Sequence, residues 1–330
     1  MAKTGLVLGV DIGGTNTALG LIDREGICHG ADSMPTRGDQ PVQEFFRRLN
    51  ERAQGLLGAV GGGFELLGIG MGAPNANYAR CTIENPPNLS WNHVDLRAEW
   101  APYFRAIVAA TNDANAAALG EMRFGAARGL KDFIVITLGT GLGSGIVVDG
   151  RMVYGSTGLA GELGHLIVDP EGRLCGCGRR GCLETYASAT GLLRTVSELL
   201  EGGSRATELR DIPRGELTSR RVFEAARRGD EVALEAFRIT GEILGRKLAD
   251  AVVFTSPEAI ILFGGLAGAG ELLFGPTRRA MEANLFPVFR GTVKLLPSGI
   301  QGNAAILGAA ALGWEALAQG AQTSRGDGKG

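Results

Sequence analysis

The strongest constraint on the fold of this chain is a pattern that occurs once in each half: a short apolar strand, a glycine-rich turn and a second strand. The first turn reads Asp11-Ile-Gly-Gly-Thr-Asn16, and the second reads Gly139-Thr-Gly-Leu-Gly-Ser-Gly145. Apolar runs bounded by Gly, Asn and Asp predict strands joined by tight turns. Two copies of this hairpin, separated by segments with helical periodicity, predict an α/β protein with a duplicated lobe.

The same patterns divide the chain into lobes. Residues 1–113 are predicted to form a smaller N-terminal lobe, and residues 114–302 a larger C-terminal lobe that contains a metal site. An alanine-rich helix over about 303–319 is predicted to pack back on the first lobe. The last residues, 320–330, are small and polar and are predicted to be disordered.

Composition excludes several classes of protein. Hydrophobic residues make up 45% of the chain and charged residues 21%, which is typical of a soluble globular protein. The 33 Lys and Arg residues nearly balance 35 Asp and Glu, and no block of like charges favours a nucleic acid or a membrane surface as partner. No apolar run reaches the ~20 residues of a membrane span, and no signal peptide is visible. We expect a cytoplasmic protein with no nucleic-acid partner and no membrane partner.

One histidine and three cysteines lie close together in the second half: His165, Cys175, Cys177 and Cys182. Three thiolates and one imidazole complete the tetrahedral coordination of Zn²⁺, which leaves no open position for catalysis. We therefore predict a structural zinc site, against the alternative of three free cysteines beside an unrelated histidine. Glu162 and Glu184 flank the cluster, and carboxylates tethered in this way are suited to accept hydrogen bonds from sugar hydroxyls.

The two glycine-rich turns are candidate phosphate sites, because backbone N–H groups can approach an anion closely where side chains are absent. Asp11 ends the first strand, where its carboxylate is suited to hold Mg²⁺. Thr137 and Thr140 add hydroxyl donors to the second turn, and Gly264-Gly265 follows a further apolar strand. A pair of ordinary β-turns is the alternative. No Gly-x-x-x-x-Gly-Lys-Ser/Thr motif is present, so a P-loop is excluded.

Asn112 and Asp113 stand where an apolar strand ends and a helix begins. Ligand sites of α/β sheets lie at the carboxyl ends of strands, where an aspartate can accept a proton from a substrate hydroxyl. Asn and Asp are also common helix N-caps. The sequence leaves both interpretations open.

Five segments carry a resemblance to a known family: Asp11-Ile-Gly-Gly-Thr15, Asn112-Asp113-Ala-Asn-Ala-Ala-Ala-Leu-Gly-Glu121, Leu138-Gly-Thr-Gly-Leu-Gly143, Gly161-Glu-Leu-Gly-His165 and Cys175-Gly-Cys-Gly-Arg-Arg-Gly-Cys-Leu-Glu184. Together they resemble the ROK family of repressors, open reading frames and sugar kinases, over about residues 6–318. The resemblance implies an actin-like, hexokinase-type (ribonuclease H-like) fold of two lobes with a cleft between them. It also implies that the cleft binds ATP-Mg²⁺ and a hexose.

The resemblance further implies a role for individual residues. Asp113 becomes the base that deprotonates the 6-hydroxyl of the sugar. The implied sugar contacts are Gly72, Asn88, Asn112, Asp113, Glu162, His165 and Glu184, with His165 also a zinc ligand. The implied nucleotide contacts are Asp11, Gly13, Gly14, Thr15, Asn16, Thr137, Gly139, Thr140, Gly141, Gly264 and Gly265, with Asp11 also a magnesium ligand.

One loop departs from the commonest family pattern and bears on which sugar is used. Many members have Gly-x-Pro-Gly after the third strand, whereas this chain has Gly72-Ala-Pro-Asn-Ala-Asn77. Some glucokinase-like members share Ala-Pro-Asn and a downstream Pro-Asn-Leu, here Pro87-Asn-Leu89. The resemblance therefore implies ATP-dependent phosphorylation of glucose to glucose 6-phosphate.

The alternatives are an N-acetylmannosamine or other amino-sugar kinase and, less expected, a non-catalytic sugar-responsive regulator. Repressors of the family carry an N-terminal helix-turn-helix of several dozen residues, whereas the first strand here begins near Leu6. Family members are often dimers, so we expect a homodimer.

Overall fold

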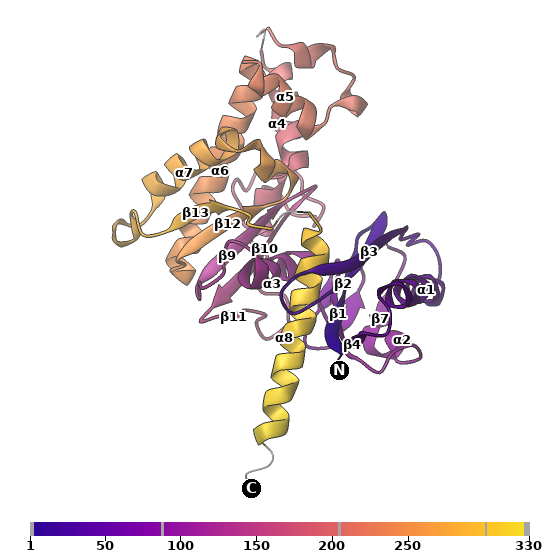
Figure 1. Ribbon diagram of the computed structural model, residues 1–330. Helices are drawn as coiled ribbons and strands as arrows, with labels where there is room; N and C mark the ends of the chain where they lie inside the picture. The colour runs from indigo at the N-terminus through magenta and orange to yellow at the C-terminus, as the bar shows by residue number, and fades with distance from the viewer. Residues whose placement is uncertain (1–2, 87–88, 204–205, 301, 327–330) are drawn as a thin grey trace. The chain divides into compact units, whose positions relative to one another are not determined.

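The computed structural model describes residues 3–86, 89–203, 206–300 and 302–326. The chain forms two compact units, which are described separately (Figure 1). The first unit contains residues 1–129, 152–160 and 299–330, and the second contains residues 130–151 and 161–298. The predicted sugar contact Asn88 and the last tail residues, 327–330, lie outside the described residues.

The first unit is built on a five-stranded mixed sheet of order β3-β2-β1-β4-β8. Its strands are β1 (Thr4–Ile12), β2 (Asn16–Ile22), β3 (Cys28–Pro35), β4 (Phe64–Gly72) and β8 (Ile107–Thr111). β1 and β2 form the predicted antiparallel hairpin, whereas β4 and β8 run parallel to β1. The register pairs Asp11 with Gly72, and Gly72 with Thr111. The carboxyl ends of three parallel strands therefore meet at one edge of the sheet.

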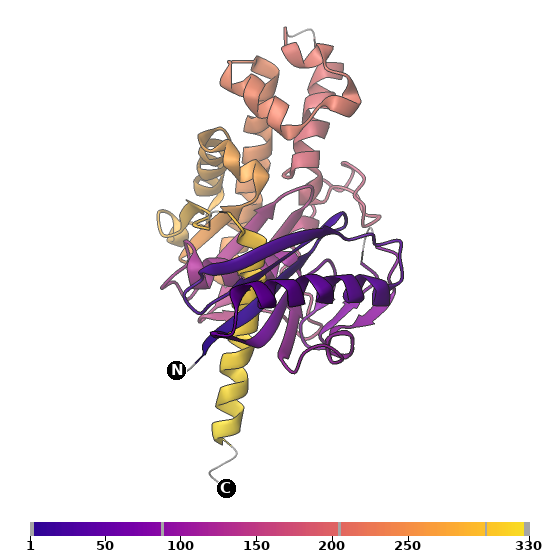
Figure 2. The same ribbon diagram turned by 45° about the vertical axis from the view of Figure 1, so that its right-hand side comes forward.

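Helices cover both faces of this sheet, as Figure 2 shows for α1 (Val42–Val60) in front and α8 (Ala304–Gly326) behind. Side chains alternate along β1: Leu6 and Leu8 share a core with Phe45 of α1, whereas Val7 packs with Ile306 of α8. Small residues allow α8 to approach the sheet backbone closely, because a Cβ on Gly70 of β4 would lie 1.8 Å from the carbonyl oxygen of Ala309. The unit also contains α2 (Leu96–Trp100), α3 (Asp113–Phe124) and a small sheet of β5 (Ala76–Asn77), β6 (Thr82–Glu84) and β7 (His93–Asp95).

The second unit repeats the sheet topology strand for strand, in the order β11-β10-β9-β12-β13. Its strands are β9 (Phe133–Leu138), β10 (Leu142–Val148), β11 (Arg151–Met152), β12 (Ala259–Phe263) and β13 (Lys294–Pro297). An antiparallel hairpin of β9 and β10 is again followed by two parallel strands, β12 and β13. The predicted duplicated α/β fold is confirmed.

Helices of the second unit pack on its sheet around a core that includes Ile134, Ile260 and Leu248. The α-helices are α4 (Ala189–Glu201), α5 (Ser219–Arg227), α6 (Glu231–Thr255) and α7 (Glu271–Asn284). Short 3₁₀ turns are η1 (Leu163–His165), η2 (Leu183–Thr185), η3 (Glu208–Asp211), η4 (Arg214–Glu216), η5 (Gly265–Ala269) and η6 (Pro287–Phe289).

The boundary after the first unit lies at residue 129 rather than at the predicted residue 113, because α3 packs on α8. A Cβ on Gly308 of α8 would lie 2.5 Å from the carbonyl oxygen of Ala116 in α3. The fully buried Glu121 also accepts hydrogen bonds from the backbone N–H of Ala126 (2.7 Å) and of Gly299 (3.1 Å), which holds both chain segments in this unit. α8 continues to Gly326, beyond residue 320, where the predicted disordered tail begins.

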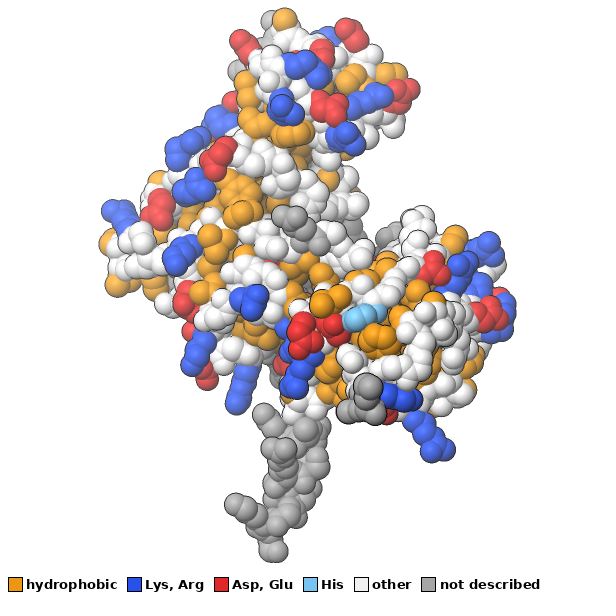
Figure 3. Space-filling model, viewed as in Figure 1, with side chains coloured by type: hydrophobic (Ala, Val, Ile, Leu, Met, Phe, Trp, Pro, Cys, Tyr) orange, Lys and Arg blue, Asp and Glu red, His pale blue; other side chains and the backbone are white. Residues whose placement is uncertain are grey.

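The surface matches the balanced composition. Figure 3 shows Lys and Arg side chains interspersed with Asp and Glu over the face in view. Among the residues that the structure describes, no helix has both the length and the apolar character that a bilayer span requires.

Candidate active site

Asp113 is the first residue of α3, directly beyond the carboxyl end of β8. The N-cap of this helix is Asn112, whose Oδ1 accepts a hydrogen bond from the backbone N–H of Asn115 (2.7 Å). The Asp113 carboxylate accepts a bond from the adjacent N–H of Ala114 (2.9 Å). The sequence left open whether these residues cap the helix or serve a ligand site. Asn112 caps the helix, so the carboxylate of Asp113 is not required as a cap.

Asp11 and Asp113 lie in the same unit, and both carboxyl groups have a raised pKa. For Asp113 the cause is burial, which disfavours the charged form. For Asp11, burial and then the charge of Asp113 raise the pKa to about 6. Paired acids with perturbed pKa values at the end of a sheet are typical of a site for acid–base or metal chemistry. Gly72 lies beside them, since a Cβ there would be 3.4 Å from Oδ1 of Asp11.

The first glycine turn connects β1 to β2 and is open to solvent at its tip. The backbone N–H of Gly13 donates to the carbonyl oxygen of Asn16 (3.0 Å), and the hydroxyl of Thr36 donates to the carbonyl oxygen of Gly13 (2.7 Å). Gly14, Thr15 and Asn16 are exposed. Hydrogen bonds therefore hold the base of the turn, and its tip is exposed to solvent. A turn that binds phosphate needs both properties.

The second glycine turn connects β9 to β10 in the second unit. Gly139 and Thr140 are exposed, and the N–H of Gly139 donates to the carbonyl oxygen of Gly141 (3.1 Å). The hydroxyl of Thr137 accepts from the N–H of Gly143 (3.1 Å), so this predicted phosphate contact is engaged within the turn itself.

Gly264 and Gly265 follow β12, which lies next to β9 in the sheet. Gly264 has a φ of +101°, and a Cβ there would lie 2.7 Å from the carbonyl oxygen of Leu138, so glycine is required at this position. A Cβ on Gly265 would meet nothing within 4 Å. Gly264 therefore lies against Leu138, the residue that precedes the second glycine turn.

The predicted metal ligands come together from the end of η1, which contributes His165, and from the loop between η1 and η2, which contributes the cysteines. One nitrogen of His165 and the three sulfurs of Cys175, Cys177 and Cys182 all lie within 4.8 Å of one another. The Sγ atoms of Cys177 and Cys182 are 3.6 Å apart, close to the roughly 3.8 Å expected between two sulfurs bound tetrahedrally to one zinc. The backbone N–H and side chain of Arg179 lower the pKa of Cys177 to about 6, which favours the thiolate that binds zinc. The donor set and its spacing fit a closed structural zinc site.

Glu184 lies between this cluster and the second glycine turn. Its Oε1 accepts a hydrogen bond from the Sγ of Cys175 (3.0 Å) and lies 3.9 Å from Nδ1 of His165. A Cβ on Gly141 would be 2.8 Å from Oε2 of Glu184. Glu162 is exposed at the start of η1, in a segment bound to β10 by the hydrogen bond from the N–H of Leu163 to the hydroxyl of Ser144 (3.2 Å).

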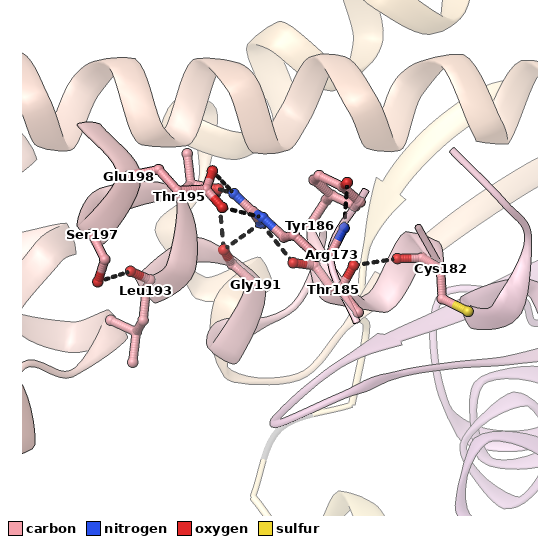
Figure 4. A network of polar contacts seen from close by, with 9 residues as sticks. All are labelled: Arg173, Cys182, Thr185, Tyr186, Gly191, Leu193, Thr195, Ser197 and Glu198. Carbon is pink, nitrogen blue, oxygen red and sulfur yellow. Dashed lines mark hydrogen bonds and ion pairs between the residues drawn. The ribbon is translucent and has the colours of Figure 1, made fainter. Parts of the chain in front are cut away.

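Sequence reasoning missed Arg173, the centre of a polar network in the second unit (Figure 4). Its side chain is only 10% exposed and binds groups on both sides of the start of α4. Its place two residues before Cys175 was the one signal in the sequence, and arginines at such positions are usually solvated.

Comparison with known proteins identifies the family. The ROK family profile matches residues 7–316. The chain is 36% identical over 310 residues to a glucokinase of Thermotoga maritima, covering 93% of this chain and 96% of that one. It is 34% identical over 318 residues to a glucokinase of Streptomyces coelicolor, covering 94% and 98%. Among solved structures, it is similar to a ROK family glucokinase from Streptomyces griseus in complex with glucose and AMPPNP, with 35% identity, a TM-score of 0.78 and coverage of 94% and 100%.

The family match spans nearly the whole chain, and the neighbouring structure is a sugar kinase with the actin-like fold of two domains that the motifs predicted. The chain therefore belongs to the ROK family.

Proposed function

We propose that the protein is an ATP-dependent glucokinase that transfers the γ-phosphoryl group of ATP to the 6-hydroxyl of glucose. The observation that carries the proposal is the position of Asp113, a buried carboxyl group with a raised pKa beyond the end of β8, relieved of helix capping by Asn112. The similarity to glucokinases over more than nine-tenths of the chain supports the choice of reaction and sugar.

In the proposed reaction Asp113 accepts the proton of the sugar 6-hydroxyl while that oxygen forms a bond to the γ-phosphorus. The bond from this phosphorus to the β,γ-bridging oxygen breaks, and ADP leaves. A raised pKa makes the carboxylate a stronger base, and a base whose pKa approaches the working pH transfers protons most effectively. Phosphoryl transfer otherwise asks the protein for positioning and charge neutralisation.

The other sugar contacts are proposed from both units. Gly72 and Asn112 lie next to Asp113 in the first unit, and Asn88 is assigned from its motif alone. Glu162, His165 and Glu184 come from the segments around the metal cluster in the second unit. Carboxylates accept hydrogen bonds from sugar hydroxyls with strength and direction, so Glu162 and Glu184 would determine which hydroxyls are recognised.

The nucleotide is proposed to bind at the two glycine turns. The contacts from the first unit are Asp11, Gly13, Gly14, Thr15 and Asn16; those from the second are Thr137, Gly139, Thr140, Gly141, Gly264 and Gly265. Asp11 would hold Mg²⁺, which neutralises phosphate charge when bound. His165, Cys175, Cys177 and Cys182 would hold a structural Zn²⁺ that fixes the loop carrying Glu184.

We further propose a cytoplasmic homodimer that acts at the entry to glycolysis, with no nucleic-acid or membrane partner. Exposed apolar side chains in the second unit support self-association, since Phe254, Phe286 and Val288 are 88%, 61% and 66% exposed. Sedimentation equilibrium of the purified protein tests the dimer.

A coupled assay of ADP release over a panel of hexoses tests the function. We expect glucose to give the highest kcat/KM and glucose 6-phosphate to be the product. A higher kcat/KM with N-acetylmannosamine would identify that sugar, rather than glucose, as the substrate. Absence of turnover with every hexose would refute the kinase assignment.

A further inference from the structure

The guanidinium of Arg173 binds a single short stretch of the chain, residues 185–198 (Figure 4). Nη1 donates to the carbonyl oxygens of Thr185 (2.6 Å) and Gly191 (3.1 Å), and Nη2 donates to the hydroxyl of Thr195 (2.8 Å). Nε and Nη2 also bind the carboxylate of Glu198 at 2.8 and 2.6 Å. The side chain thereby joins η2 to the first three turns of α4.

The rest of Arg173 binds the same region. The guanidinium carbon lies 4.4 Å from the ring centroid of Tyr186, and the backbone N–H of Arg173 donates to the Tyr186 hydroxyl (3.2 Å). The carbonyl oxygen of Arg173 accepts from the N–H of Gly181, within the loop of metal ligands (2.8 Å). Arg173 therefore connects the metal loop to the segment that begins at Glu184.

The segment that begins at Glu184 contains a proposed sugar ligand and also contacts the second glycine turn. At one end, Thr185 directly follows the proposed sugar ligand Glu184. A few residues later, the N–H of Ala189 donates to the carbonyl oxygen of Gly139 in the glycine turn (2.9 Å). The hydroxyl of Thr190 donates to the carbonyl oxygen of Thr140. A displacement of η2 relative to α4 would move the sugar carboxylate and the nucleotide turn together.

A purely stabilising ion pair does not account for this geometry. Glu198 is 58% exposed, and exposed pairs contribute little. The planar guanidinium accounts for the geometry, because it directs Nη1 to the two backbone carbonyl oxygens while Nη2 reaches the hydroxyl of Thr195. A lysine cannot reproduce that planar group or the contact with the Tyr186 ring.

We propose that Arg173 is a positioning residue, which holds Glu184 and the glycine turn at Gly139–Gly141 in a fixed relation for phosphoryl transfer. This inference rests on the proposed function. Arg173 itself touches neither the sugar nor the phosphates; it acts through the backbone of Thr185 and Gly191.

The test compares Arg173→Met and Arg173→Lys with Arg194→Met. Arg194 is a matched control, because it lies on α4 and donates to the carbonyl oxygen of Leu174 in the same loop (2.9 Å), yet is exposed. We expect Arg173→Met to retain zinc and to raise the KM for glucose and the KM for ATP together, each roughly ten-fold or more, since small displacements of binding groups have large kinetic effects. Arg173→Lys should lie between Arg173→Met and the native enzyme, and Arg194→Met should stay within about two-fold of native.

A merely structural role predicts a different result: a lower melting temperature and fewer active molecules, with both KM values of the remaining enzyme unchanged. That result, or a rise in one KM alone, would overturn the inference. If Arg173→Met does not fold, Arg173→Lys decides by the same criterion. If the native protein phosphorylates glucose and the variants keep native KM values, this inference alone is refuted. If the native protein phosphorylates no hexose, the proposed function is refuted, and this inference with it.

Discussion

Asp11 lies near Asp113 in the first unit, and burial together with the charge of Asp113 raises the pKa of Asp11 to about 6. Two carboxylates that both lose hydration and repel one another reduce the stability of the folded chain when they ionise. Such a pair is retained for what it binds or for the proton it accepts. The first two predictions separate these contributions.

The first prediction concerns the pH dependence of stability. The pKa of Asp11 is about 6 when folded and 3.8 ordinarily. Between about pH 4 and 6 the unfolded chain therefore releases this proton first, and stability falls as pH rises, by about 3 kcal/mol in total. Asp11→Asn removes this loss, so its gain in stability over the native protein should grow across that window. Urea denaturation from pH 4 to 7.5 without Mg²⁺ measures it.

The control for this prediction is Asp149→Asn, at a side chain that is 80% exposed. Its stability should stay close to that of the native protein. A constant difference for Asp11→Asn would contradict the pKa assignment.

The second prediction separates the base from the helix cap. Asp113→Asn should lower kcat by about 10²–10⁴-fold, because the proton acceptor is removed, without lowering the melting temperature, because a buried charge is also removed. Asn112→Ala should instead lower stability by about 1 kcal/mol through the lost cap. Steady-state kinetics and thermal unfolding give both readings. An Asp113→Asn variant that retains more than about a tenth of native kcat would leave Asp113 without a catalytic role.

The third prediction concerns the metal. Structural zinc contributes ~10–16 kcal/mol in small peptides, which is large beside a typical global stability of ~5–15 kcal/mol. Cys177→Ser should therefore purify with less zinc than the native protein, melt at a lower temperature and lose affinity for glucose more than for ATP. Elemental analysis and titrations of each ligand measure these effects.

Cys28→Ser is the control, since this exposed cysteine belongs to the first unit, whereas the cluster belongs to the second. It should leave zinc content and affinity unchanged. A native protein without zinc, whose stability and glucose binding do not respond to a chelator, would rule out the site.

The fourth prediction concerns the second glycine turn. A Cβ on Gly139 would meet no protein atom within 4 Å, so Gly139→Val should fold normally. Its branched side chain would occupy the space proposed for phosphate oxygens, so ATP affinity should fall sharply while glucose binding without nucleotide persists. Gly215→Val, at another exposed glycine with open space, should change neither affinity. Equal loss of both affinities in Gly139→Val would show that the turn supports the fold instead.

Features encoded by short stretches of the sequence were predictable. The glycine hairpins and the metal cluster each depend on residues that lie close together in the chain, and the structure has both. The cluster of candidate metal ligands was recognisable because its residues, from His165 to Cys182, are close in the chain.

Features that depend on distant residues were not predictable from those patterns. The boundary at residue 129 follows from α3 packing on α8, where Ala116 meets Gly308 across most of the chain length. Arg173 has partners at Thr185, Gly191 and Thr195, and no spacing rule marks a buried arginine inside a loop. The division of labour between Asn112 and Asp113 depends on a one-residue difference in where α3 begins, which propensities do not resolve.

The chain passes between the two units at residues 129, 151, 160 and 298, so neither unit is a continuous piece of polypeptide. During synthesis from the N-terminus, the sheet of the first unit is made early but lacks α8, the helix that covers one of its faces, until the last part of the message is read. The second unit can complete its fold before α8, which the first unit needs, has been synthesised. A gene truncated before residue 299 would therefore encode an intact second unit beside a first unit with an uncovered sheet, and neither unit can be exchanged between proteins as a single cassette.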